Sequence, residues 1–359
     1  LWNAAQTGEG SLMLALFMGV STGASIVVSQ YYGAKDREAL SRAVGTIIVV
    51  TFWAGVITMA AGVLLSRPLL LLLDTPAEML DMAAQYLVIV FAGIIGCAYY
   101  NILSGILRGL GDSTSPLLYL LLTTVLNIGL DILFVTAFGM TTDGVAWATI
   151  LAQSVSAVLC YRKLTRMPQV LTLNRQALKM DKAIASRTLR LGMPAGLTQA
   201  IFSMQAVVVQ SLMNSLGSAV VTAGTAVMRV DGFAMMPNFT FGIAATTFTG
   251  QNYGAGRLDR VHHGARDGLK LALVCATLLT LSILLFGRQL MNVFTDTEAV
   301  VDIGVRMLQI LAVGYIAFAV TQTLSGVMRG MNETVIPMWV GIAVTVGVRL
   351  PLAYLFAAL

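Results

Sequence analysis

Two polar residues lie deep in an apolar stretch of the chain. Asp131 is about fifteen residues into the segment 116–138, and Asn127 precedes it by four. Residues four apart lie on one face of a helix. A carboxylate in hydrocarbon costs about 3 kcal/mol, so such acids normally face a cavity and serve a function. The pair offers a titratable carboxylate and a neutral oxygen ligand, which predicts a site for H⁺ or Na⁺. The structural alternative is a hydrogen bond to a neighbouring helix.

The whole chain has the composition of a membrane protein. It is 57% hydrophobic and 11% charged, whereas soluble domains contain about 25% charged residues. A helix that crosses a bilayer needs about 20 apolar residues. Ten segments qualify: 5–32, 43–65, 83–107, 116–138, 144–164, 189–215, 222–250, 268–287, 303–328 and 335–359.

The sequence repeats itself at one constant offset. SGILRGLGDSTSP begins at Ser104 and SGVMRGMNETVIP at Ser325, while QYYGA begins at Gln30 and QNYGA at Gln251. The distance from Ser104 to Ser325 equals that from Gln30 to Gln251, and we call it the repeat offset. Two motifs in one register indicate two homologous halves, which is a common layout of membrane transporters.

The polar pair is not duplicated. Val348 and Leu352 occupy the positions that correspond to Asn127 and Asp131 in the second half. The two halves therefore differ in chemistry at this place.

The repeat predicts an all-α polytopic membrane protein made of two homologous helical bundles. We expect an N-lobe at 1–165, a basic cytoplasmic linker at 166–187 and a C-lobe at 188–359. The segments 144–164 and 189–215 have no partner in the other half, so we expect ten transmembrane helices of a twelve-helix parent that has one more at each end. The linker is expected to be an amphipathic helix on the anionic leaflet or a solvated tether.

The basic residues lie on one side of the predicted membrane. Of the 22 lysines and arginines, 17 fall in loops on that side. Positively charged loops stay in the cytoplasm, so we expect a multi-pass protein of the bacterial inner membrane. The predicted cytoplasmic loops are those after Gln30, Arg108, Tyr161, Gln251 and Arg329. The net charge of +5 is thereby explained without a nucleic-acid partner.

The Q-x-x-G-A motifs end a predicted helix in each half. Gln30 and Gln251 begin the motifs, and Gly33 and Gly254 are expected to be left-handed C-caps, where a Cβ would cost energy. We interpret both motifs as structural, with a role in closing a cytoplasmic gate as the alternative.

The R-G motifs are interpreted in the same way. Arg108-Gly109 and Arg329-Gly330 each precede a proline that starts the next helix. We expect ion pairs between each arginine and the following acid, namely Arg108 with Asp112 and Arg329 with Glu333.

These residues carry a family resemblance. G-x-S-T-G-A-S-x-x-V-S-Q-Y-Y-G-A at 19–34 resembles the end of the second helix of multidrug and toxic compound extrusion (MATE) transporters, and L-R-G-L-G-D-S-T-S-P at 107–116 resembles the loop after their fourth helix. The resemblance implies helices 2 to 11 of a twelve-helix antiporter. Such proteins expel organic, often cationic compounds in exchange for H⁺ or Na⁺.

The resemblance also bears on the ion site. MATE N-lobes carry Asn and Asp at the spacing of Asn127 and Asp131, near a Thr for which Thr149 is the best match. A further family carboxylate on helix 1 would lie upstream of Leu1. Some members carry a glutamate on helix 7, where this chain has only amides: Gln199, Gln205 and Gln210. This difference favours the N-lobe as the coupling site.

The C-lobe offers a candidate substrate cavity. It would be formed by Asp231 together with Met204, Gln205 and Met235, since flexible methionines suit a promiscuous site. The alternative is that Asp231 reaches the outer interface or pairs with Arg229.

The sequence therefore predicts secondary active multidrug efflux by H⁺ or Na⁺ antiport. We expect no cofactor, no enzymatic activity, no metal beyond Na⁺ at Asp131 and Asn127, and a monomer that contacts small organic substrates and membrane lipids. The alternative is a flippase for lipid-linked oligosaccharide. It would need several basic residues in its cavity, whereas only Arg229 and Arg349 lie well inside predicted helices, away from their ends.

Overall fold

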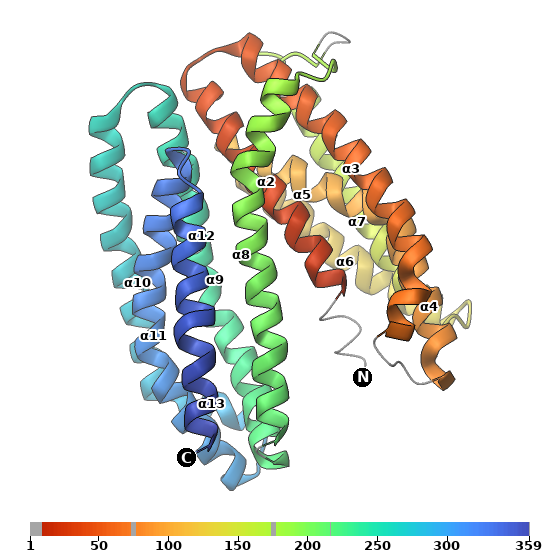
Figure 1. The fold of residues 1–359 in the computed structure, drawn as a ribbon, viewed down its shortest axis with the longest axis vertical. Helices are drawn as coiled ribbons and strands as arrows, with labels where there is room; N and C mark the ends of the chain where they lie inside the picture. The colour runs from red at the N-terminus through yellow and green to blue at the C-terminus, as the bar shows by residue number, and fades with distance from the viewer. Residues whose placement is uncertain (1–8, 73–76, 174–176, 216, 359) are drawn as a thin grey trace. The chain divides into compact units, whose positions relative to one another are not determined.

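The computed structural model describes residues 9–72, 77–173, 177–215 and 217–358. Every regular element in these residues is a helix (Figure 1). The first half contains α2 (Glu9–Gly33), α3 (Arg37–Leu72), α4 (Ala77–Ala92), α5 (Ile94–Gly109), α6 (Thr114–Thr136) and α7 (Thr142–Thr165). The second contains α8 (Lys182–Ser215), α9 (Ser218–Gly254), α10 (Leu258–Asn292), α11 (Glu298–Gly330), α12 (Val335–Ile342), the π-helix η1 (Ala343–Arg349) and α13 (Leu350–Ala358).

The helices confirm the membrane prediction. Eight spans in the described residues are long and apolar enough to cross a bilayer, and the bent pair α4–α5 supplies a ninth. These nine match nine of the ten predicted segments. The tenth, 5–32, corresponds to α2, which is described from Glu9 onward.

The predicted duplication is visible in the helix ends. The starts of α3 and α10 are separated by the repeat offset, and so are those of α6 and α12; the ends of α2 and α9, and those of α5 and α11, have the same separation. The chain forms two compact units, Leu1–Gly196 and Leu197–Leu359. The boundary between them falls inside α8, shortly after Pro194.

In unit 1, glycines bring α5 into backbone contact with α2. A Cβ on Gly105 would lie 2.3 Å from Ser21 Oγ, and one on Gly109 would lie 2.8 Å from the carbonyl oxygen of Ser25. Lipid chains are as apolar as leucine, so membrane helices associate largely through close van der Waals packing of small residues. The glycine of the first R-G motif is therefore a packing residue at the end of a helix.

Unit 2 repeats this contact between α11 and α9. A Cβ on Gly326 would lie 2.2 Å from the carbonyl oxygen of Gly242, and one on Gly330 would lie 2.8 Å from that of Thr246. Each of these four positions corresponds, by the repeat offset, to one of the four in unit 1. The repeated motifs thus encode the same helix pair twice.

The two halves differ where α4 meets α5. The predicted single segment 83–107 is bent by 46° near Gly93, and the Ile150 side chain fills the place where a Cβ on this glycine would stand, at 2.3 Å. The corresponding Gly314 lies within the continuous helix α11 and has nothing within 4 Å of a Cβ. The bend thus coincides with close packing of Ile150 on Gly93, whereas Gly314 has no such contact among the described residues.

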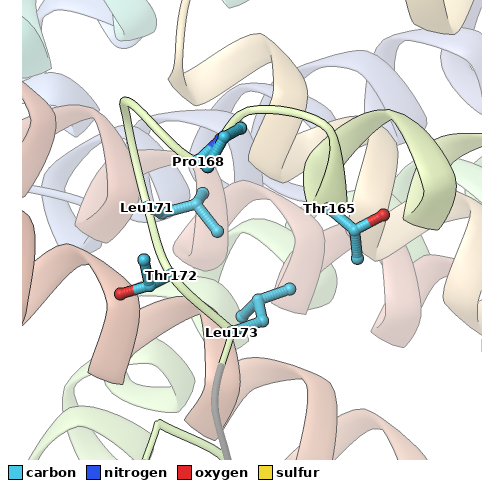
Figure 2. Close-up of a pocket in the computed structure, with 5 residues that line it drawn as sticks. All are labelled: Thr165, Pro168, Leu171, Thr172 and Leu173. Carbon is cyan, nitrogen blue, oxygen red and sulfur yellow. The ribbon is translucent and has the colours of Figure 1, made fainter.

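The described part of the linker packs against α3. Leu171 is buried, the Thr172 amide donates to Ser41 Oγ at 3.0 Å, and the Asp181 amide donates to Thr46 Oγ1 at 3.2 Å. The segment between α7 and α8 is irregular in its described residues and several of them are exposed, so the expected amphipathic helix does not lie there. Together with the end of α7 it lines a small pocket of about 220 Å³ (Figure 2), formed by Thr165, Pro168, Leu171, Thr172 and Leu173.

The glycine contacts give a stability prediction. Gly326→Ala should lower the free energy of unfolding by about 1–3 kcal/mol, because the methyl group must push two helix backbones apart. Gly129→Ala in α6 is the matched control, since a Cβ there meets nothing within 4 Å. Thermal unfolding of the purified protein in detergent measures both, and equal midpoints would contradict the packing role.

Candidate functional site

Asn127 and Asp131 lie on α6, a helix with few buried residues. Asn127 Nδ2 and Asp131 Oδ1 are nevertheless both shielded from solvent, and neither has a hydrogen-bond partner within the described part of the chain. Buried polar atoms are nearly always paired. This result distinguishes the pair from a settled helix–helix hydrogen bond and leaves both groups available to a ligand.

The neighbouring helix α7 runs antiparallel to α6 and fixes the height of the pair. Ser156 Oγ donates to the carbonyl oxygen of Tyr119 at 3.0 Å, and a Cβ on Gly144 would lie 3.1 Å from Phe134 Cβ. This register places Thr149 level with Asn127.

Thr149, however, is not joined to the pair by a hydrogen bond. Its side chain is exposed, and its hydroxyl donates to the Val145 carbonyl oxygen of its own helix at 3.0 Å. The structure thus places Asn127 and Asp131 on one face of α6. Thr149 lies at the level of Asn127, but its hydroxyl donates a hydrogen bond within α7 rather than to the pair.

Gln153 is a site candidate that the sequence analysis missed. It follows Thr149 by four residues on α7, and its Oε1 is buried without a partner among the described residues. An amide four residues from a polar threonine inside an apolar segment was the available signal. The α6–α7 register places Gln153 about one helical turn from the level of Asn127. Its amide oxygen is neutral, like that of Asn127, while Asp131 alone can carry H⁺. Within the described residues, no three His, Cys, Asp or Glu side chains cluster as a metal site.

The C-lobe candidates separate into two environments. Gln205 is buried and Asp231 is half-buried with Oδ1 shielded. Met204 is exposed, and Met235 packs against the apolar core of unit 2. The predicted cavity group therefore does not act as one set of side chains.

The Q-x-x-G-A motifs end helices, but not through their glycines. Gly33 and Gly254 are the last residues of α2 and α9, and neither has a positive φ. The left-handed residues follow two positions later, at Lys35 (φ 57°) and Gly256 (φ 69°). The prediction for Gly33 and Gly254 is wrong because the left-handed residue lies two positions further along in each case, and the amide after it donates to the carbonyl oxygen of Tyr31 or Asn252 in a Schellman motif.

Gln30 also contacts α8, which the motif did not predict. Arg187, at the start of α8, donates to Gln30 Oε1, and its guanidinium lies 5.6 Å from the centre of the Tyr31 ring. The first motif therefore ties α2 to the beginning of α8 within unit 1.

The predicted ion pair of Arg108 with Asp112 is wrong. Asp112 instead lies 3.6 Å from Lys163 Nζ and accepts hydrogen bonds from the Ser115 amide at 2.9 Å and from its hydroxyl at 2.7 Å. Asp112 is thus a cap for α6. Burial alone would raise the pKa of Asp112, but the hydrogen bonds from Ser115 and the charge of Lys163 outweigh burial and lower it.

Glu333 does the same in the second half. Its Oε1 accepts from the amides of Val335 and Ile336, each at 3.0 Å, so the expected pair with Arg329 does not form. The acid in each motif begins the next helix because a carboxylate satisfies free amides at a helix N-terminus.

This architecture, with polar residues enclosed in apolar helices of two homologous units, is that of a polytopic membrane transporter. Residues 5–133 and 194–355 match the MatE family model, and the chain belongs to this family of multidrug efflux transporters. Members of the family are transporters rather than enzymes and need no cofactor.

Individual relatives agree with the assignment. The chain is 30% identical over 353 residues to the probable multidrug resistance protein YoeA of Bacillus subtilis, covering 96% of this chain and 76% of the relative. It is 26% identical to the probable multidrug resistance protein NorM of Thermotoga maritima, covering 94% of this chain and 74% of that protein. A crystal structure of MATE in complex with MaL6 shares the fold, with a TM-score of 0.93 and 22% identity over 99% of this chain and 80% of the other.

The left-handed positions give a matched pair of substitutions. Gly256→Ala should lower the free energy of unfolding by about 1 kcal/mol, and Lys35→Gly should raise it by about as much, because only a residue with a Cβ is strained there. Gly268→Ala, in the helical part of α10 with nothing within 4 Å of a Cβ, controls for helix propensity. Chemical or thermal unfolding checks the opposite signs; a Lys35→Gly protein that is less stable would contradict the prediction.

The cap on α6 gives a pH dependence. At neutral pH, Asp112→Asn should cost about 0.5–1 kcal/mol of stability, because the amide oxygen can still accept from the Ser115 amide but the charge that interacts with Lys163 and with the helix N-terminus is lost. Because the folded state lowers the pKa of Asp112, the advantage of the wild type is present above the ordinary carboxyl pKa and is lost as the pH falls through the folded-state value. Unfolding midpoints of both proteins across an acid pH series measure this convergence. A difference that does not change with pH would mean that the charge plays no part.

Proposed function

We propose that the protein is a secondary active multidrug exporter that exchanges H⁺ or Na⁺ for organic, often cationic compounds. The observation that carries the proposal is the enclosed Asp131 carboxylate oxygen, which has no partner among the described residues and lies one helical turn from Asn127. The multidrug resistance proteins among the relatives supply the substrate class.

The proposed cycle is alternating access. Binding of the coupling ion at Asp131 neutralises a charge inside α6 and favours a different packing of α6, which buries few of its residues, against α7. Substrate binding on the outward side is then weakened, and release of the ion inward resets the protein. Ion and substrate are coupled because each binds better to one of the two packings.

The proposed setting is the bacterial inner membrane, with a monomeric protein. The loops after α2, α5, α7, α9 and α11 would be cytoplasmic, in line with the excess of basic residues in these connections. The basic linker at 166–187 would then face the anionic leaflet, whose lipids are a second class of partner.

Gradient-driven transport tests this function. The full-length protein in liposomes should export ethidium under an imposed H⁺ or Na⁺ gradient, and Asp131→Asn should reduce this export to background. Asp302→Asn, an exposed acid paired with Arg288 at 3.2 Å, controls for the loss of one negative charge. Undiminished gradient-driven export by Asp131→Asn would overturn the site, and export that ignores both gradients would overturn antiport.

A substitution of Asn127 distinguishes Na⁺ coupling from H⁺ coupling. With Na⁺ as the coupling ion, Asn127→Ala should raise the half-saturating Na⁺ concentration by about tenfold, the effect of losing one ligand oxygen worth about 1.4 kcal/mol. With H⁺, the same substitution should leave the pH profile of transport in place, because Asp131 alone carries the proton.

A further inference from the structure

The first turns of α10 carry three basic residues whose counterparts in unit 1 are uncharged. Arg260, Arg266 and Lys270 are all exposed. By the repeat offset, they correspond to three positions of α3, namely Ala39, Gly45 and Val49. At these positions the duplicated helix therefore carries cations in one half only.

In unit 1, the linker covers the corresponding end of α3. Ser41 Oγ and Thr46 Oγ1 accept hydrogen bonds from backbone amides of the linker at 3.0 and 3.2 Å. A Cβ on Gly45 would overlap the carbonyl oxygen of Ala177. The linker backbone therefore packs directly on this face of α3, and the missing side chain of Gly45 makes room for it.

The same face of α10 is uncovered in the described structure. α10 packs against α9 and α11 (Figure 1). The positions that correspond to Ser41, Gly45 and Thr46 are all exposed in unit 2, and they are His262, Arg266 and Asp267. Because an arginine replaces the glycine, a backbone segment cannot approach this face as closely as the linker approaches α3.

The uncovered end of α10 has an excess of positive charge. Residues 257–270 contain four lysines and arginines and two aspartates. Lys270 Nζ lies 3.7 Å from Asp267 Oδ1, and such exposed ion pairs bind weakly. The guanidinium groups of Arg260 and Arg266 make no hydrogen bond or ion pair with any residue in the described part of the chain. These two cations are free to meet an anionic partner.

An exposed apolar stripe follows the basic residues on the same side of α10. Leu271, Val274 and Leu278 are 61%, 57% and 61% exposed. Val274 and Leu278 continue the line of Lys270, because residues four apart share one face of a helix. The outer side of α10 thus changes from charged to apolar between Lys270 and Leu271, as expected where a helix enters a bilayer.

The depth of the basic residues can be estimated from the helical rise. At 1.5 Å per residue, Arg266 lies about 8 Å before Leu271, whereas Arg260 lies about 16 Å before it. The headgroup layer on each side of a bilayer is about 5–8 Å thick. Arg266 and Lys270 therefore reach the level of the lipid phosphates, and Arg260 lies beyond it.

We propose that this end of α10 binds an anionic phospholipid of the cytoplasmic leaflet. Arg266 and Lys270 hold its phosphate, and its acyl chains lie along the exposed apolar stripe. The positive charge selects an anion, and the adjoining stripe selects a lipid over a soluble anion or an acidic protein, which would leave the stripe unused. The proposal rests on the membrane orientation proposed above, but it involves no residue of the coupling site.

Quenching of a local tryptophan by brominated lipids tests the site. The four native tryptophans are replaced by phenylalanine, and the reporter is introduced by Leu271→Trp. In vesicles that contain both lipids, brominated phosphatidylglycerol should bind beside the reporter about tenfold more tightly than brominated phosphatidylcholine. This preference combines about fivefold for Arg266, the usual effect of one basic residue near an anionic surface, and about twofold for Lys270, which Asp267 partly offsets.

A second reporter at the other end of α10 is the matched control. Leu285 is 71% exposed, and the nearby Arg288 is paired with Glu298 and Asp302. Leu285→Trp should therefore show no preference for phosphatidylglycerol. Equal quenching by the two lipids at Leu271→Trp would overturn the proposal and leave the basic face to water or to a soluble acidic partner.

Substitutions in the Leu271→Trp protein assign the preference to single residues. Arg266→Gln should reduce it to about twofold, and Arg266→Gln with Lys270→Gln should remove it. Arg260→Gln removes an equally exposed arginine of the same helix and should leave the preference in place. An unchanged preference in a folded double variant, checked by thermal unfolding, would contradict the role of these residues.

The lipid site and the coupling site can fail independently. Asp131→Asn should keep the lipid preference at the Leu271→Trp reporter while losing gradient-driven export. Failed export with an intact lipid preference would overturn the coupling proposal alone. A missing preference in a protein that still exports would overturn the lipid site alone. Because both leaflets of the vesicles have the same composition, the result does not depend on how the protein is oriented in them.

Discussion

Backbone-to-backbone packing at small residues is the constraint on which both units depend. Gly105 and Gly109 on α5, and Gly326 and Gly330 on α11, each leave a space that the neighbouring helix fills with its own backbone or a short side chain. In a lipid environment this close approach replaces the hydrophobic drive that water would supply. The large apolar residues then complete the interior around each pair, as Leu103, Ile106 and Leu107 do in unit 1.

Because of this constraint, the residues that pack the helices together differ from the residues that could bind ions or substrates. The helix pairs α2–α5 and α9–α11 make the same close contacts at equivalent glycines. The polar residues lie largely away from these contacts. Asn127 and Asp131 are on α6, which buries few of its residues, and Arg349 ends the equivalent run in the second half. The helical run that carries Asp131 in the first half thus carries Arg349 in the second.

Much of the fold could be predicted from the sequence because its signals are local and repeated. The length of the apolar segments indicated the spans, and the constant repeat offset indicated the two halves. The bend near Gly93 could not be foreseen, since Gly314 occupies the same position within one continuous helix, and the contact of Ile150 with Gly93 is not visible in the sequence. The left-handed residues were missed because only one of them is a glycine: Lys35 and Gly256 both have a positive φ, and a lysine gives no sign of this conformation in the sequence.

The site was predictable only in part. An acid within an apolar segment is conspicuous in a sequence, and Asp131 was found that way. The burial of Gln153 and the packing of the linker on α3 depend on which faces of different segments meet, and no local pattern records that. The roles of Asp112 and Glu333 were misread because an acid beside an arginine suggests an ion pair, whereas the free amides of the next helix are closer in space.

The central claim is that Asp131 holds the coupling ion. It is tested most directly by measuring H⁺ and Na⁺ binding at neutral pH to the purified full-length wild type and to Asp131→Asn, by proton release and by equilibrium binding of radioactive Na⁺. The account predicts that the wild type binds one more ion per molecule than the variant, either H⁺ or Na⁺. Identical H⁺ and Na⁺ binding by the two proteins would contradict it.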